Sequence, residues 1–183
     1  ITVDGDTSTN DSLFLLANGQ AGNPVLGMGD EGVAAFQAGL NHVCRHLAIE
    51  VARDGEGATK LIEVNVTGAR TLHDARVCAR AIAGSMLLKS AVYGGDPNWG
   101  RIMMAAGKSG CDLVESKVDV LVGDVELFRQ GTPLAYDVKA AETVLSNKEV
   151  PITVRLNLGD HAATAWGCDL TEEYVHINAD YTT

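Results

Sequence analysis

The sequence predicts a mixed α/β fold in which helices pack on a sheet. Hydrophobic residues make up 46% of the 183 residues, which is enough for a sizeable core. Only 5% are aromatic, and small aliphatic residues are plentiful, so helices and strands can approach closely. Helical and strand periodicities alternate in the first half of the chain, and strands dominate the second half. This order favours an α+β mixed sandwich over a doubly wound sheet.

The first half contains two helical patterns with a strand between them. Asp30, a residue type suited to capping, precedes apolar residues that recur at helical spacing from Val33 to Ala52. Alternating apolar and polar residues over Lys60–Thr67 predict a half-buried strand. A pattern that begins at Leu72 predicts one long helix up to a glycine turn. A short helix over Trp99–Ala106 follows that turn.

The pattern of the second half predicts mainly strands. A helix is predicted over Asp137–Leu145, and Gly123-Asp124 has the composition of a hairpin turn. The predicted strands are Val118–Val122, Val125–Phe128, Pro151–Leu156, Ala162–Leu170 and Tyr174–Ile177. The apolar run Leu13–Ala17 is too short for periodicity to assign. We expect one unit over residues 1–183, with two lobes at about 1–115 and a β-rich 116–183.

Charge and composition restrict the class of protein. The net charge of −10 argues against a nucleic-acid partner, which would need a basic face. The sequence has no apolar run near the roughly 20 residues of a membrane span and no signal-peptide layout, so we expect a cytoplasmic protein without membrane contact. The four cysteines form no C-x-x-C pair and predict neither a zinc site nor a disulfide framework. Ile1 is unlike a natural start, so a preceding piece is expected.

Familiar catalytic motifs are incomplete. His42 and His46 have metal-ligand spacing on a helix, but no glutamate follows the first histidine, so no metal is predicted. Ser85 follows a glycine but lacks the second glycine of a nucleophile elbow. Gly107-Lys108-Ser109 lacks the leading glycine of a phosphate loop. The polar cluster Asp4–Asp11 lacks calcium-loop spacing and is interpreted as a network that ties down a turn and caps the next element.

Two glycine-rich turns could present a site. In the first, Pro97 makes the turn rigid, and Asp96, Asn98 and Arg101 project from it. The alternative is a well-capped helical corner with Trp99 in the core.

In the second turn, Glu56 stands between two glycines, where a carboxylate can lie close to a ligand. The alternative there is a solvated turn.

Four separated motifs together resemble the ornithine acetyltransferase family, the bifunctional glutamate N-acetyltransferases of arginine biosynthesis. The motifs are Ile1–Asp11, Asp54–Lys60, Gly95–Arg101 and Ile177–Thr183, and they occur in the family's order. The resemblance implies an N-terminal-nucleophile type of αβ assembly, in which a precursor cleaves itself before a threonine. That threonine begins the β chain and serves as nucleophile. This sequence then resembles most of a β chain, with the nucleophile upstream of Ile1 and no catalytic residue of its own.

The resemblance also implies site residues. Glu56, Asn178 and Thr183 match the substrate contacts of the family, and Glu56 suits a substrate ammonium. Asp96, Asn98 and Arg101 belong to a family signature and are assigned a site-shaping role.

The implied reaction moves an acetyl group from N2-acetylornithine to glutamate through an acyl-enzyme. The resemblance implies no cofactor, although acetyl-CoA is a possible co-substrate. The implied partner is the α chain of the same precursor, in an α2β2 heterotetramer. Two alternatives remain open at this point: an N-terminal-nucleophile amidase or aminopeptidase, with water as acceptor, and a non-catalytic binding subunit.

Overall fold

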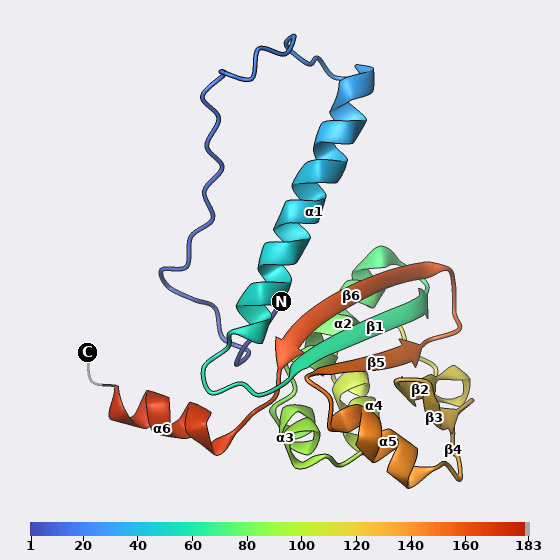
Figure 1. The fold of residues 1–183 in the computed structure, drawn as a ribbon. Helices are drawn as coiled ribbons and strands as arrows, with labels where there is room; N and C mark the ends of the chain where they lie inside the picture. The colour runs from blue at the N-terminus through green and yellow to red at the C-terminus, as the bar shows by residue number, and fades with distance from the viewer. Residues whose placement is uncertain (182–183) are drawn as a thin grey trace.

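A mixed sheet of six strands forms the centre of the computed structural model, which describes residues 1–181 (Figure 1). The strand order is β4-β3-β2-β5-β1-β6. Only β1 and β5 run parallel, and the other neighbouring strands of the described chain are antiparallel. The strands are β1 (Leu61–Ala69), β2 (Asp119–Val122), β3 (Val125–Arg129), β4 (Thr132–Pro133), β5 (Glu149–Arg155) and β6 (His161–Cys168).

Helices pack on the buried face of this sheet. Alternate residues of β1, namely Ile62, Val64 and Val66, are fully buried, which confirms the half-buried strand predicted there. α2 packs against β1 and β6, and α4 packs against α2. The helices are α1 (Glu31–Arg53), α2 (Leu72–Ala83), α3 (Met86–Gly94), α4 (Trp99–Gly107), α5 (Val138–Leu145) and α6 (Glu172–Asp180), with a 3₁₀ turn at Glu115–Lys117.

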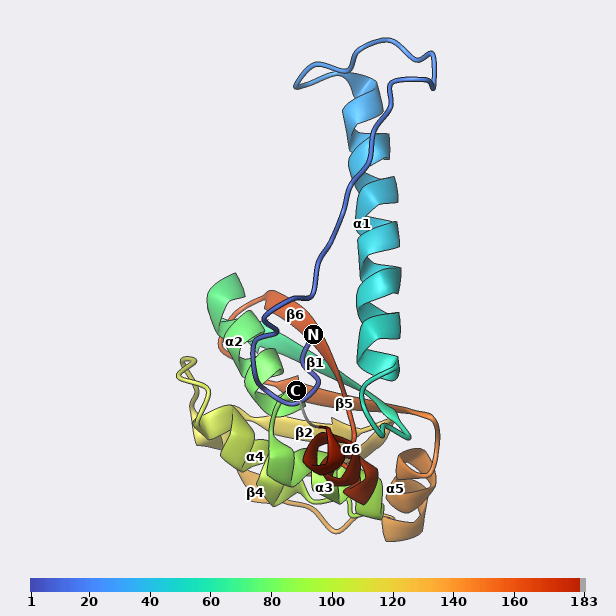
Figure 2. The same ribbon diagram turned by 90° about the vertical axis from the view of Figure 1, so that its left-hand side faces the viewer.

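A long arm stands away from the sheet (Figures 1 and 2). We define the arm as residues 12–53, comprising α1 and the segment before it. Within the described chain, residues 12–30 form neither helix nor strand, so the apolar run at 13–17 belongs to no regular element. Asp30 precedes α1 as predicted, but its carboxylate accepts a hydrogen bond from the Gly27 N–H at 2.7 Å rather than from a helix N–H. The polar cluster before the arm ties down local turns, through bonds such as Asp11 N–H to Ser8 Oγ at 3.0 Å, but caps no helix.

Two of the predicted helices and strands were wrong. The helix expected from Leu72 to the glycine turn is two helices, because Gly84 ends α2 and the Ser85 hydroxyl accepts a hydrogen bond from the Leu88 N–H and starts α3. The strand expected over Tyr174–Ile177 is part of α6. Thr171 caps that helix, and two glutamates occupy its first turn, where negative charge favours a helix.

The remaining elements lie within a few residues of their predicted bounds. The hairpin at Gly123-Asp124 joins β2 to β3, as predicted. The two-residue strand β4 was not foreseen. Among residues 1–181, the helices are all too short or too polar to cross a bilayer.

Candidate functional site

The loop between α1 and β1 carries Glu56 and lies where several segments meet. Both glycines beside Glu56 are needed for this packing. A Cβ atom on Gly57 would lie 2.6 Å from the backbone N of Tyr174, and Gly57 also has a φ of +66°. A Cβ atom on Gly55 would lie 2.7 Å from the Cys168 sulfur. The glycines therefore allow the loop to contact both the end of β6 and the start of α6.

A buried carboxylate holds the second half of this loop. Asp169 is 2% exposed and accepts hydrogen bonds from the backbone N–H of Thr59 at 2.7 Å and of Lys60 at 2.9 Å. The Thr59 hydroxyl also donates to it. The Thr171 hydroxyl donates to the Gly57 carbonyl at 2.7 Å. The loop is thus fixed to the segment between β6 and α6.

Glu56 and Asn178 are brought together across this junction. The Asn178 Nδ2 atom donates to Glu56 Oε2 at 2.7 Å, although the two residues are 122 positions apart. The same amide donates to the Tyr174 carbonyl at 2.9 Å, within α6. Two of the three predicted substrate contacts therefore lie side by side and exposed to solvent. Thr183 lies outside the described residues, and a substrate contact remains a prediction for all three.

The residues assigned a site-shaping role form a helical corner between α3 and α4. The Asn98 carboxamide oxygen accepts from the Arg101 N–H at 3.1 Å, and its Nδ2 donates to Asp96 at 3.0 Å. The Arg101 guanidinium donates to the Leu87 carbonyl at 2.8 Å. Trp99 stacks on Phe128 with ring centroids 4.9 Å apart. These contacts account for the motif as a capped corner, and its effect on the site remains a prediction.

The corner is connected to the Glu56 loop through one lysine. The Lys60 ammonium donates to the carbonyl oxygens of Val92 at 2.7 Å and Tyr93 at 3.2 Å, at the end of α3. Lys60 therefore connects the loop to the end of α3, just before the corner.

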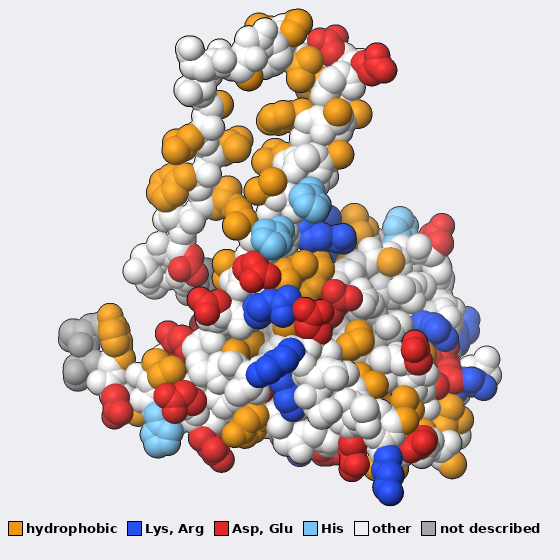
Figure 3. Space-filling model, in the orientation of Figure 1, with side chains coloured by type: hydrophobic (Ala, Val, Ile, Leu, Met, Phe, Trp, Pro, Cys, Tyr) orange, Lys and Arg blue, Asp and Glu red, His pale blue; other side chains and the backbone are white. Residues whose placement is uncertain are grey.

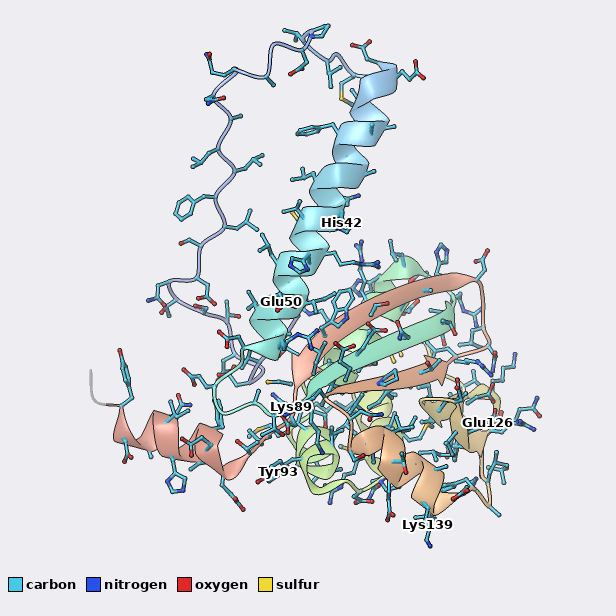
Figure 4. The ribbon with its side chains drawn as sticks, in the orientation of Figure 1. His42, Glu50, Lys89, Tyr93, Glu126 and Lys139 are labelled. Carbon is cyan, nitrogen blue, oxygen red and sulfur yellow. The ribbon has the colours of Figure 1, made fainter. Side chains whose placement is uncertain are left out.

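A second group of polar residues lies beside the loop and was not identified from the sequence. The Tyr174 hydroxyl donates to Asp4 Oδ2 at 3.0 Å. The backbone N–H of Asp6 is the main cause that lowers the pKa of Asp4, and the Tyr174 hydroxyl and the charge of Lys89 lower it further. Burial, followed by the bond to Asp4, raises the pKa of Tyr174. Lys89 lies at the meeting point of α3, the loop and the end of β6 (Figure 4).

Two other candidate chemistries gain no support from the geometry. His42 and His46 lie exposed on α1, and within residues 1–181 no three potential metal-binding side chains gather (Figure 4). Burial raises the pKa of the Cys168 thiol, which keeps the neutral, weakly nucleophilic form near neutral pH.

Comparison with solved structures identifies the class of fold. A crystal structure of the arginine biosynthesis bifunctional protein argJ from Bacillus halodurans is 46% identical in sequence and superposes with a TM-score of 0.95. The match covers 98% of this chain and 85% of that chain. The class is therefore the mixed α/β sheet with packed helices found in that protein. The ArgJ family model matches residues 1–183, and the chain belongs to the ArgJ family. The family resemblance inferred from four motifs is confirmed.

Relatives match over the whole of this chain. The "Arginine biosynthesis bifunctional protein ArgJ" of Symbiobacterium thermophilum is 56% identical over 183 residues, which are all of this chain and 46% of that protein. The "Glutamate N-acetyltransferase" of Methanocaldococcus jannaschii is 48% identical over 191 residues and is covered to 46%. The chain spans about half the length of the curated relatives it matches.

Proposed function

We propose that this chain is the β-chain part of an enzyme that transfers the acetyl group of N2-acetylornithine to glutamate. The observation that carries the proposal is the contact between Glu56 and Asn178 at 2.7 Å, in a member of the ArgJ family. A carboxylate beside an amide suits a substrate that has both an ammonium group and polar hydrogen-bonding atoms. The names of the two relatives, which specify arginine biosynthesis and glutamate N-acetyltransferase, support the same reaction. We place the reaction in the cytoplasm.

The nucleophile of this reaction is a threonine upstream of Ile1, formed by cleavage of the precursor. Its free α-amino group acts as general base for its hydroxyl. The hydroxyl oxygen attacks the acetyl carbonyl, the amide C–N bond breaks, and ornithine leaves with the proton. The amine of glutamate then attacks the resulting ester, which releases N-acetylglutamate and restores the hydroxyl. Acetyl-CoA could supply the acetyl group in the first step.

The partner that we propose is the α chain of the same precursor, and the arm is its docking surface. Apolar side chains on both halves of the arm face solvent (Figure 3). Phe14 is 82% exposed, and Phe36 on α1 is 60% exposed. Such an exposed apolar surface is typical of a permanent interface. The relatives' additional length is sufficient for a second chain of similar size, and an α2β2 assembly follows in our proposal.

Cys44 provides a test of this interface. It lies exposed on α1, four residues after Leu40 and three before Leu47, within the helical spacing of the apolar stripe. In the assembled αβ protein we expect iodoacetamide to modify Cys44 at least about tenfold more slowly than an exposed thiol, and to modify it fully after denaturation. Mass spectrometry of the labelled peptide measures this rate. Rapid labelling of Cys44 in the intact assembly would contradict the proposed interface.

The reaction itself is tested on the protein purified after expression of the complete precursor. We expect the purified protein to appear as two chains and to convert N2-acetylornithine and glutamate into equal amounts of ornithine and N-acetylglutamate. Release of free acetate without N-acetylglutamate would instead indicate an amidase. Binding of the substrate without any conversion would indicate a binding subunit.

A further inference from the structure

Helix α6 carries Asn178 but is held to the rest of the chain mainly by polar contacts. None of its described side chains is buried, so hydrophobic packing contributes little to its position. Figure 1 shows it projecting from the body of the molecule beyond α3. Thr171 anchors the start of the helix to Gly57, and Asn178 reaches Glu56 near its end. A further contact lies between these two anchors.

Tyr174 supplies that contact and lies one turn before Asn178. Its hydroxyl donates to Asp4 at 3.0 Å, and its carbonyl accepts from the Asn178 amide at 2.9 Å. The side chain is half-buried, in contrast to its neighbours in the helix. Tyr174 therefore connects the N-terminal segment to the residue that meets Glu56.

The acceptor of this bond is itself fixed. Asp4 accepts from the Asp6 N–H at 2.9 Å, and Thr2 joins the same segment to β6 through its N–H and the Trp166 carbonyl at 3.0 Å. Lys89 is 1% exposed, and none of the ion pairs recorded among residues 1–181 includes it. A buried ammonium favours ionised carboxylates in its surroundings. The Asp6 N–H above all, and to a smaller extent the charge of Lys89, lowers the pKa of Asp4, so the bond from Tyr174 is made to a carboxylate and is stronger than a neutral one.

We propose that Tyr174 is a positioning residue, which fixes α6 on Asp4 so that Asn178 stays beside Glu56 when substrate binds. The proposal rests on the proposed function but concerns the order of the helix. Tyr174 acts through Asn178 and need not touch the substrate. Loss of its hydroxyl would leave the residues of the site in place, but Asn178 would lie beside Glu56 for a smaller fraction of the time. The apparent affinity for the substrate then falls in proportion to that fraction.

The test uses Tyr174→Phe in the complete αβ protein. Hydrogen exchange of the amides at 174–180 is expected to become about tenfold faster, whereas exchange in β1 stays unchanged. KM for N2-acetylornithine is expected to rise about tenfold with kcat within about twofold, because saturating substrate selects the docked helix. Tyr93→Phe is the matched control, since Tyr93 is exposed and its hydroxyl makes no hydrogen bond recorded among residues 1–181.

A double variant separates positioning from a general structural effect. In the Asn178→Ala background, Tyr174→Phe is expected to change KM by less than about twofold, because the residue through which it acts is gone. Unchanged exchange over 174–180, or full additivity of the two substitutions, would overturn the proposal. Exchange is measured without turnover. A wild-type protein that transfers no acetyl group would therefore contradict the proposed function, while the exchange data would still decide the role of Tyr174.

Discussion

Replacing Glu56 with glutamine in the complete αβ protein is expected to lower kcat/KM for N2-acetylornithine by about 10- to 100-fold. Glutamine keeps the size of the side chain and an oxygen that can accept from Asn178, so the substitution removes mainly the charge. A hydrogen bond to a charged group contributes about 1.5–3 kcal/mol, and each 1.4 kcal/mol corresponds to a factor of ten. Glu56→Ala should reduce kcat/KM at least as much, since it also removes the acceptor of Asn178.

A substrate without the terminal amine shows whether the lost binding energy comes from the interaction between Glu56 and the substrate ammonium. N2-acetylnorvaline has the carbon skeleton of N2-acetylornithine but no ammonium group on its side chain. The wild-type protein should prefer N2-acetylornithine by about the same 10- to 100-fold, and Glu56→Gln should abolish the preference.

The matched control is Glu142→Gln, an exposed glutamate on α5, away from α6 and the Glu56 loop. It should leave kcat/KM for both substrates within about twofold of the wild type. Equal losses on the two substrates in Glu56→Gln would show that the carboxylate has a structural role only.

The elements that could be predicted from the sequence are those whose periodicity reflects burial on one face. β1 alternates because every second residue enters the core, and the hairpin after β2 is marked by its glycine. α6 could not be predicted in this way, because none of its described side chains is buried and its four central residues are mostly β-branched or aromatic. Its helical state depends on the Thr171 cap and the acidic first turn. The break between α2 and α3 depends similarly on Gly84, a residue that helices sometimes tolerate.

The candidate site was predictable only in part, because most of it comes from contacts between distant segments. The two glycines around Glu56 are a local signal, and the structure gives each a steric reason. The meeting of Glu56 with Asn178 has no local signal, and only the family resemblance grouped them. Tyr174 was hidden by the wrong strand prediction, since a helix would have placed it one turn before Asn178. Asp169 is a single acid after a strand, and its importance appears only when its donors are known.

Replacing Asp169 with alanine is expected to destabilise the protein by about 3 kcal/mol. Alanine would leave the backbone N–H groups of Thr59 and Lys60, and the Thr59 hydroxyl, without their acceptor. An unsatisfied buried donor costs about 1–3 kcal/mol, and relaxation of the loop would recover part of the sum. The midpoint of urea denaturation, followed by fluorescence on the complete αβ protein, measures the change.

The same substitution should also lower activity, because Asp169, just after β6, holds the loop that carries Glu56. The midpoint of urea denaturation of Asp169→Asn should lie between those of Asp169→Ala and the wild type, since the amide oxygen can still accept from a backbone N–H whereas the charge is lost. Asp160→Ala is the control, because the side chain of Asp160 is fully exposed on the connection before β6. It should change stability by less than about 0.5 kcal/mol. Equal midpoints for Asp169→Ala and Asp160→Ala would mean that Thr59 and Lys60 find other acceptors, and the loop would then be held by Thr171 and the Lys60 ammonium without Asp169.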